Sequence, residues 1–367
     1  MKFSCEKDIL LKEISLAGEI ISSRNALSIL SNVFLHAENN ELVIRATDLK
    51  VGFETRIPID VQESGSTTVY CDKFLNVLRS LPAGEVEFEQ DSSDRLVVRP
   101  RFKKIDFKLR SISSEKYPEV QLAPEESYFE FPQSVLVEMI SQTVFAVSDD
   151  ETRYFMNGVY VEQQEGQLVM VATDGRRLSH ISHDPEAPLP TFPGVIVPPK
   201  ILSLIKKLST GEGNLSLAIT QKNVFVKLDN QRLSSALIEG QFPNYRRVIP
   251  DSQQYQLAVK REELQDALKR VSLLVEKSRR VYLTMGQEGL LLKSEEGEIG
   301  QATEEVSCQY EGPETTMALN FTYLADPLRV IETEEVTLQF TESNKAITIQ
   351  PTPEANYFHI VMPMQLD

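Results

Sequence analysis

Residues 168–178 read LVMVATDGRRL, an apolar run that ends in Ala-Thr-Asp-Gly. A short apolar run bounded by Asp-Gly is typical of a buried β-strand that ends in a tight turn. An earlier strand pattern, residues 42–48, reads LVIRATD and closes on the same three residue types. The recurrence predicts that the chain repeats one structural unit with a period of about 125 residues.

The same order of elements recurs in three stretches of the chain. Each stretch begins with a helix predicted from apolar residues at helical spacing, as in Leu10, Ile14 and Ala17. Hairpins are predicted next, at 33–46, 159–172 and 282–292. Two further strands lead to a second helix, predicted at 72–81, 199–208 and 321–331, and a proline corner closes each repeat.

The predicted fold class is therefore α+β, with three repeated domains at residues 1–122, 123–252 and 253–367. Each domain is expected to pack two helices on antiparallel sheet. The linkers are placed at 121–128, which is acidic and contains a proline, and at 250–256, which is polar and lacks periodicity. The alternative is a chance likeness among common α+β elements, and the colinear order of the elements argues against it.

Composition excludes several classes of protein. The chain has 367 residues, 41% of them hydrophobic and 25% charged, which is too apolar for a disordered chain and too long for one core. No apolar run approaches the roughly 18 residues that a spanning helix needs, and no signal region follows Met1, so a cytoplasmic protein is expected. Three widely separated cysteines predict neither a disulfide framework nor a metal site.

Cations gather on two of the predicted helices although the net charge is −16. The helix at 199–208 carries Lys200, Lys206 and Lys207 and no acidic residue. The corresponding helix at 72–81 carries Lys73 and Arg79 against one aspartate. Recurrence at matching positions favours a surface that holds a duplex by its phosphates without reading bases, whereas a solvated helix face is the plainer alternative.

A second charge asymmetry concerns association. Residues 99–110 contain six cations against one aspartate and alternate as a strand around Ile105, Phe107 and Leu109. Residues 295–305 contain five glutamates and no base. A basic strand and an acidic strand of this kind suit head-to-tail pairing of two chains, which closes into a ring when the rotation allows it. Two solvated outer strands are the alternative.

No catalytic constellation can be assembled from the sequence. His180 and His183 with Asp184 have no further ligand signalled nearby, and the run SDDE at 148–151 is better explained as a solvated loop than as a magnesium site. Neither a phosphate-binding glycine loop nor a nucleophile elbow occurs. We therefore predict no enzyme, no metal and no cofactor, and a metal-dependent hydrolase using these histidines is kept as an alternative.

Four ordered motifs bear a family resemblance. They are RYFMNG at 153–158, ATDGRRL at 172–178, FPNYRRVIP at 242–250 and VMPMQL at 361–366. Together with the threefold repeat, they resemble the bacterial sliding clamp, the beta subunit of DNA polymerase III. The resemblance implies a homodimeric closed ring of clamp-type domains with helices inside, which encircles double-stranded DNA without sequence preference. A monomeric peptide-binding scaffold that does not encircle DNA is the alternative.

The resemblance also implies partners and site residues. The ring would tether the polymerase III alpha subunit, the clamp loader, other polymerases and repair proteins through an apolar peptide pocket, and no membrane is involved. By family position, residues near DNA would be Arg24, Tyr154, Phe155, Lys200 and Arg279, to which helix geometry adds Lys73, Lys206 and Lys207. The pocket would be lined by Arg153, Tyr154, Met156, Thr173, Gly175, Arg176, Arg177, Leu178, Pro243, Arg247, Val248, Asn320, Tyr323, Ile360, Met362, Pro363 and Met364.

The dimer edge is expected to combine apolar and charged residues. Phe107, Leu109 and Leu273 match apolar interface positions of the family, and the charge pattern adds Lys104, Glu296 and Glu298. The chain departs from the family pattern at Arg176, where many relatives have histidine, and at Gln365, which replaces a frequent arginine. These departures are expected to shift partner preference.

Overall fold

The computed structural model describes residues 1–21, 29–295, 297–298 and 300–366. Arg24 and Glu296, two of the predicted site residues, lie outside this part of the chain. The described residues form two compact units. Unit 1 comprises Met1–Pro132 and Glu212–Ala236, and unit 2 comprises Gln133–Gly211 and Leu237–Asp367.

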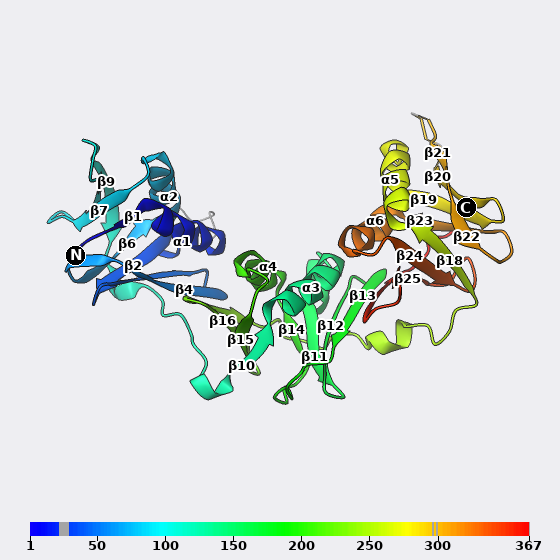
Figure 1. Cartoon of the computed structure of the whole chain (residues 1–367), viewed down its shortest axis with the longest axis horizontal. Coiled ribbons are helices and arrows are strands. Elements are labelled where there is room, and N and C mark those ends of the chain that lie inside the picture. Colours follow the sequence, from blue (N-terminus) through cyan, green and yellow to red (C-terminus); the bar gives the residue numbers. More distant parts are fainter. Residues whose placement is uncertain (22–28, 296, 299, 367) are drawn as a thin grey trace. The chain divides into compact units, whose positions relative to one another are not determined.

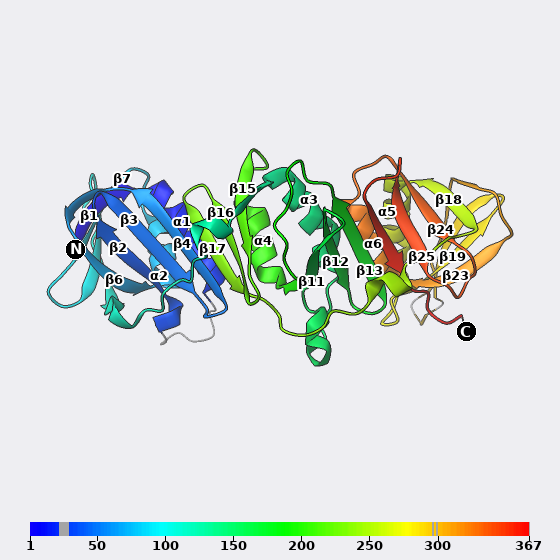
Figure 2. The same ribbon diagram turned by 90° about the horizontal axis from the view of Figure 1, so that it is seen from below.

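Unit 1 is built on one antiparallel sheet with the strand order β10-β15-β16-β17-β4-β3-β2-β6-β9-β8-β7-β1-β5. Figure 2 shows β2, β3 and β4 running side by side in this sheet. The strands are β1 (Lys2–Glu6), β2 (Asn32–Glu38), β3 (Glu41–Thr47), β4 (Val51–Pro58), β5 (Asp60–Glu63), β6 (Gly65–Tyr70), β7 (Glu85–Gln90), β8 (Arg95–Pro100), β9 (Phe107–Ile112), β10 (Phe129–Pro132), β15 (Asn214–Ile219), β16 (Asn223–Leu228) and β17 (Gln231–Ala236).

Two helices of unit 1, α1 (Lys7–Ile20) and α2 (Cys71–Ser80), pack against each other, and α1 covers β3 and β4 (Figure 1). The predicted apolar stripe of α1 is buried, because residues three and four positions apart share one helix face. Beneath the helices, the rings of Phe3 and Phe88 stack at 4.8 Å and Phe74 of α2 meets Phe88 edge-on. These aromatic contacts belong to the buried core of unit 1, which also includes Leu35, Ile44 and Phe53.

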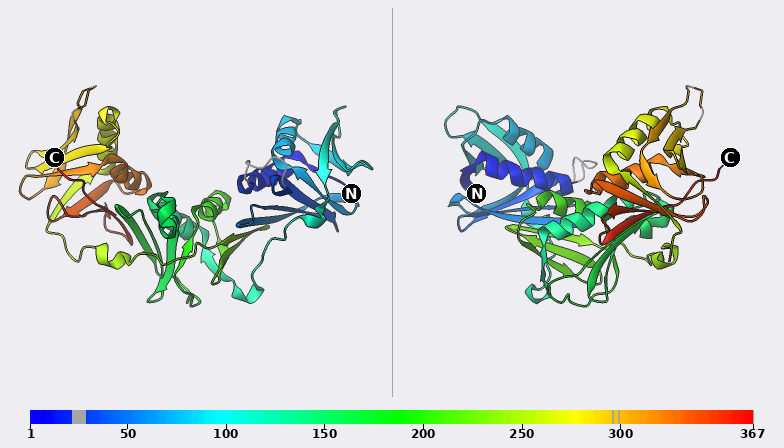
Figure 3. Two further views of the ribbon diagram at one scale, coloured as in Figure 1. Left: turned by 180° about the vertical axis from the view of Figure 1, so that it is seen from behind. Right: turned by 45° about the vertical axis from the view of Figure 1, so that its right-hand side comes forward.

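Unit 2 contains two antiparallel sheets, β14-β11-β12-β13-β26-β25-β24-β18-β22 and β21-β20-β19-β23. The view in Figure 3 shows the strands of the larger sheet beneath the helices of this unit. The strands are β11 (Val159–Gln164), β12 (Gln167–Thr173), β13 (Arg177–His183), β14 (Val195–Val197), β18 (Tyr255–Lys260), β19 (Arg280–Gly286), β20 (Gly289–Ser294), β21 (Thr303–Val306), β22 (Cys308–Tyr310), β23 (Thr315–Asn320), β24 (Glu335–Phe340), β25 (Ile347–Thr352) and β26 (Tyr357–Val361).

The helices of unit 2 come in two contacting pairs, α3 (Gln133–Thr143) with α4 (Pro199–Leu208), and α5 (Arg261–Val271) with α6 (Phe321–Val330). The prediction of two helices per repeat is thus confirmed for the described residues. Helix α4 begins at Pro199, which suits the first helical position because its missing N–H would be unsatisfied there in any case. Within α3, the hydroxyl of buried Thr143 donates to the Met139 carbonyl at 2.7 Å, so the polar residue on the apolar face is satisfied.

The three predicted hairpins are confirmed as β2/β3, β11/β12 and β19/β20. Two predicted strands were wrong in extent. The basic segment 99–110 is divided between the end of β8, a loop, and β9, so only Phe107 and Leu109 alternate within a strand and Ile105 lies in the loop. In the acidic segment, the described residues 295, 297–298 and 300–302 lie outside strands, and the glutamates that lie in a strand are Glu304 and Glu305 of β21.

Sheet pairing also crosses the predicted domain boundaries. Residues Gln231–Ser235 of β17 pair with residues Thr55–Val51 of β4, and Arg177–Ile181 of β13 pair with Val361–Tyr357 of β26. The residues predicted as a middle domain therefore contribute strands to both compact units. None of the helices in the described part of the chain has the length and apolar character to span a bilayer.

Candidate functional site

The quoted LVMVATDGRRL segment forms β12, a turn and β13, and the turn is fixed by its own side chains. The Thr173 hydroxyl donates to the Arg177 carbonyl at 2.6 Å and accepts from the Gly175 amide at 3.0 Å. An oxygen of Asp174 accepts from the amides of Arg176 and Arg177 at 2.8 and 3.0 Å. Gly175 has φ +87°, and a Cβ there would lie 2.9 Å from Nη1 of Arg153, so the turn requires glycine.

Arg177 ties this turn to helix α6. Its guanidinium donates to Asp174 at 3.1 Å, to Asp326 of α6 at 2.6 Å and to the Phe145 carbonyl at 2.6 Å. The guanidinium also lies over the Tyr323 ring, 4.7 Å from its centroid. Burial, and secondarily the nearby Asp174, raises the pKa of Tyr323, so this ring stays neutral. With two carboxylates and a carbonyl on one guanidinium, Arg177 serves to hold the cavity wall in place.

An apolar cavity of about 230 Å³ lies beside the turn. Its floor and walls come from the ends of β12, β13 and β26 and from the segment around η6 (Tyr245–Val248). The lining residues are Met156, Thr173, Gly175, Arg176, Arg177, Leu178, Pro243, Asn244, Tyr245, Val248, Ile360 and Met362. Methionine, leucine, isoleucine and valine side chains at the end of a sheet suit an apolar side chain of a ligand, and methionine can repack around different ones.

A second, more polar cavity of about 370 Å³ shares Arg176 and Met362 with the first. It is lined by Arg176, Ser278, Arg280, Asn320, Tyr323, Met362, Pro363, Met364 and Gln365. The C-terminal tail is held along it by two backbone hydrogen bonds, from the Met362 amide to the Arg176 carbonyl (2.9 Å) and from the Met364 amide to the Ala318 carbonyl (2.7 Å). The tail thus forms a wall of both cavities.

The structure brings most of the predicted pocket residues together. Ten line the apolar cavity, and Asn320, Tyr323, Pro363 and Met364 line the polar one. Arg153, Tyr154 and Arg247 line neither, although Arg153 approaches Gly175 and donates to Asp150 at 2.9 Å. The hydrogen bonds from Thr152 and the contact with Arg153 lower the pKa of Asp150 to about 2, so this contact is ionic near neutral pH.

Four lining residues were not predicted from the sequence: Asn244, Tyr245, Ser278 and Arg280. Asn244 and Tyr245 lie inside the FPNYRRVIP motif, so that motif could have supplied them. Ser278 and Arg280 approach through the pairing of β19 with β23, in which Arg280 is opposite Asn320, and no local pattern signals this.

The residues predicted near DNA are scattered over several elements. Lys73 of α2 and Lys206 and Lys207 of α4 are exposed, and Lys200 is half-buried. Arg279 is exposed just before β19, with φ +55°. Tyr154 is 53% exposed, whereas the ring of Phe155 packs against the core cluster around Phe242. A role in DNA binding stays a prediction for all of these residues.

The predicted dimer edge consists of strands paired on one side over the relevant residues. In β9, residues Phe107–Arg110 pair with β8 on one side and have no partner strand among the described residues on the other, since β6 pairs only with Ser111 and Ile112. Strand β21 likewise pairs with β20 on one side. Lys104 and Glu298 are exposed, and Phe107 and Leu109 are half-buried. Leu273 is 80% exposed.

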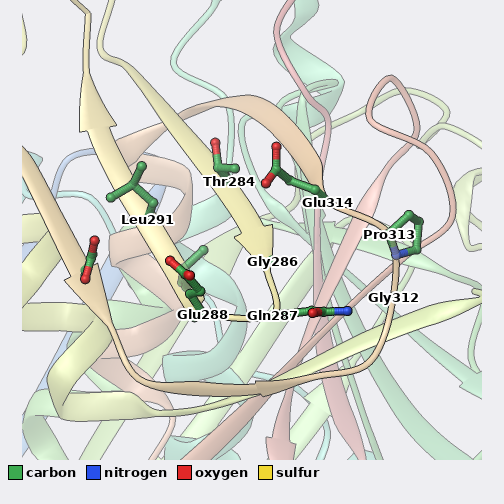
Figure 4. A pocket seen from close by; sticks show the side chains of 11 residues that line it. Thr284, Gly286, Gln287, Glu288, Leu291, Gly312, Pro313 and Glu314 are labelled. Carbon is green, nitrogen blue, oxygen red and sulfur yellow. The ribbon is translucent and has the colours of Figure 1, made fainter.

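A third cavity, of about 470 Å³, lies between the turn that joins β19 to β20 and residues 312–314 (Figure 4). It carries Glu288, Glu305 and Glu314 and no cation among its described lining residues. The histidines considered as metal ligands from the sequence do not form a metal site among the described residues. The ring of His180 instead contacts the rings of Phe358 and Tyr245. No group of three metal-ligating side chains occurs in the described part of the chain.

Comparison with known proteins gives one consistent result. Family models of the DNA polymerase III beta subunit match in order, the N-terminal domain over residues 1–121, the central domain over 130–244 and the C-terminal domain over 246–365. The chain is 48% identical to the beta sliding clamp of Treponema pallidum and 31% identical to that of Pseudomonas aeruginosa, with all of each chain covered.

Solved structures agree with the sequence relatives. The DNA polymerase sliding clamp from Pseudomonas aeruginosa matches with a TM-score of 0.92 at 29% identity. The DNA polymerase III subunit beta from Borrelia burgdorferi, in complex with a natural product, matches with a TM-score of 0.94 at 26% identity. Each match covers the whole of both chains.

Proposed function

The chain belongs to the bacterial sliding clamp family, the DNA polymerase III beta subunits, and we propose that it acts as a processivity factor that encircles duplex DNA and tethers the replicative polymerase. The observation that carries the proposal is the ordered match of three clamp domain models along the chain. The proposed domains are residues 1–122, 123–252 and 253–367. A clamp acts by topology, so the protein needs no catalytic group, and it would act in the cytoplasm where bacterial DNA is replicated.

The proposed ring is a head-to-tail homodimer with its helices lining the hole. In each of the two contacts, the free side of β9 from one copy would add to β21 of the other, with exposed Leu273 covered by Phe107 and Leu109 of the partner copy. Exposed Lys108 and Arg110 lie in β9 and exposed Glu305 lies in β21, so opposite charges would help to set the register.

DNA would be held by phosphate contacts from Lys73, Lys200, Lys206, Lys207, Arg24 and Arg279, with Tyr154 and Phe155 nearby. Such contacts read no sequence and weaken with salt, which permits sliding. Ring closure, rather than affinity, would then prevent escape.

The two connected cavities are proposed as the docking site for partner proteins. The apolar cavity would take apolar side chains of a short peptide from the polymerase alpha subunit, the clamp loader, other polymerases or repair proteins. Deleting residues 362–367 should abolish peptide binding, because the tail forms a wall of both cavities, while retention on DNA should persist. Unchanged peptide affinity would remove the assignment.

Oligomer mass and DNA topology together test the proposed function. A clamp should sediment near twice 41.5 kDa and, once loaded, should remain on nicked circular DNA but slide off the same DNA after linearisation. Equal loss from circle and linear DNA, with peptide binding intact, would favour the monomeric scaffold.

A further inference from the structure

We propose that Arg176 makes the docking site selective for peptides that carry an acidic side chain beside their apolar anchor. The inference rests on the proposed docking function and adds a specificity that nothing in the family match assigns. It concerns one side chain that lines both cavities of unit 2.

The charge of the two cavities is the first observation. Their described lining residues include Arg176, Arg177 and Arg280 and no aspartate or glutamate, in a chain of net charge −16. A cationic lining is not general to the cavities of this protein, since the cavity beside the β19–β20 turn carries three glutamates and no cation among its described lining residues (Figure 4). The charged side chains among the described lining residues of the docking site are therefore all cationic.

The second observation is how these charges are compensated. Arg177 is bonded to both Asp174 and Asp326, and Arg280 donates to Glu295 at 3.2 Å. Arg176 makes no ion pair with any described residue, and its side chain is exposed. Of the three lining arginines, Arg176 is therefore the one whose charge is not balanced by a carboxylate in the part of the chain that the structure describes, and it can pair with a carboxylate of a ligand.

The third observation is the position of Arg176 relative to the tail. Its amide is fixed by Asp174 at 2.8 Å, and its carbonyl accepts from the Met362 amide at 2.9 Å. Its backbone is therefore held in place, and because Arg176 lines both cavities, a ligand that occupies both would lie beside it. A planar guanidinium at that point matches a carboxylate, with two parallel N–H groups for two oxygens.

Designed peptides provide the probe. The series ends in Leu-Phe, is six residues long, acetylated and amidated, and has a single Asp moved through the other four positions, with an Asn counterpart for each. We expect at least one Asp peptide to bind the wild-type protein about fourfold tighter than its Asn counterpart, the size typical of an exposed ion pair. The preference should shrink as salt is raised, because the guanidinium is exposed.

The R176Q variant should bind the Asp and Asn members of each pair with equal affinity, since it removes the charge at position 176, and the affinity ratio within each pair is the quantity compared. The matched control is K269Q, which removes one exposed cation of α5 that lines neither cavity and should retain the preference.

Two results would overturn the inference: equal binding of every Asp and Asn pair, or an Asp preference that survives in R176Q. Failure of all Leu-Phe peptides to bind the wild-type protein would instead remove the docking function itself, and the inference with it.

Discussion

At the scale of single residues, the wall of the apolar cavity depends on a buried hydroxyl. Tyr245 is 4% exposed, and its hydroxyl donates to Glu162 of β11 at 2.7 Å, while Arg246 bonds the same carboxylate. E162A would leave that hydroxyl without a partner at a cost of about 1–3 kcal/mol in folding free energy. We expect E162A to weaken peptide binding about fivefold, as the loss of about 1 kcal/mol of preorganisation would.

The conservative variant separates positioning from general damage. In E162Q the amide oxygen can still accept from Tyr245, so peptide affinity should return to within about twofold of wild type. Fluorescence titration with one apolar peptide measures both variants. Equal weakening by E162A and E162Q would contradict a positioning role for this hydrogen bond.

Half-buried His180 and buried His359 make the β13–β26 strand pair sensitive to acid. Burial lowers the pKa of His180 to about 4 and that of His359, which is 1% exposed, to about 3. Below pH 6.5 the unfolded chain binds protons that the folded chain refuses, so stability must fall with pH in that range. At pH 5.5 each histidine should cost about 1.4 kcal/mol of unfolding free energy.

Urea unfolding at pH 7.5 and 5.5 tests this expectation with H180F. The phenylalanine keeps the ring that stacks on Phe358 at 4.8 Å and removes the titrating group. The loss of stability between the two pH values should be about 1.4 kcal/mol smaller in H180F than in wild type. H36Q, which replaces a histidine outside this strand pair, is the control, and an identical pH response in H180F and wild type would refute the assignment.

At the scale of elements, the chain uses one turn twice, and the sequence predicted both copies. The Thr47 hydroxyl donates to the Val51 carbonyl and accepts from the Leu49 amide, as Thr173 does with Arg177 and Gly175. The strands after the two turns pair with β17 and β26 respectively. The LVIRATD and LVMVATD strings therefore determine local structure in the same way.

The repeat pattern by itself does not say which copy of the turn lies beside an apolar cavity, and the family resemblance was what placed the pocket at the second copy. In the first copy, the position after Val51 is Gly52, and a Cβ there would lie 2.9 Å from a methyl group of Val120. In the second, the corresponding Leu178 lines the cavity beside Tyr245. The difference arises from side chains distant in sequence that fill one space and leave the other open, and such packing has no local pattern.

Helix α4 carries the element-scale prediction for DNA. Its buried stripe of Ile201, Leu204 and Ile205 leaves Lys206 and Lys207 exposed, so K206Q/K207Q should keep the unfolding temperature. If both lysines contact phosphates, the slope of log affinity against log salt should fall by about two. Binding to nicked circular DNA over a salt series measures the slope. The double variant K222Q/K345Q removes two exposed lysines from turns and serves as control, and equal slopes in both would count against α4.

At the scale of the whole molecule, charge patterns proved weaker guides than hydrophobic ones. The hairpins and helices were predicted because apolar spacing reports which face is buried. The basic residues 99–104 were predicted to lie in a strand, but β8 ends at Pro100. The prediction was wrong because exposed cations can alternate along a loop as well as along a strand. Strands β4 and β17 pair although they are far apart in sequence. Such pairing produces no periodic pattern of apolar residues, so the sequence did not predict that the sheet continues across the expected domain boundary.

Closure of the proposed ring depends on the contact between two copies of the chain around Leu273. Leu273 is 80% exposed within a single chain, so L273D should fold normally, yet a carboxylate in an apolar contact between copies would be desolvated at a cost of several kcal/mol. We expect L273D to sediment near 41.5 kDa and to be lost from nicked circles, while it still binds docking peptides, because both cavities lie within unit 2. L49D, which alters a leucine that is 68% exposed at the tip of the β3–β4 turn, is the matched control and should remain dimeric. A dimeric L273D that stays on circular DNA would show that the ring closes through a different surface.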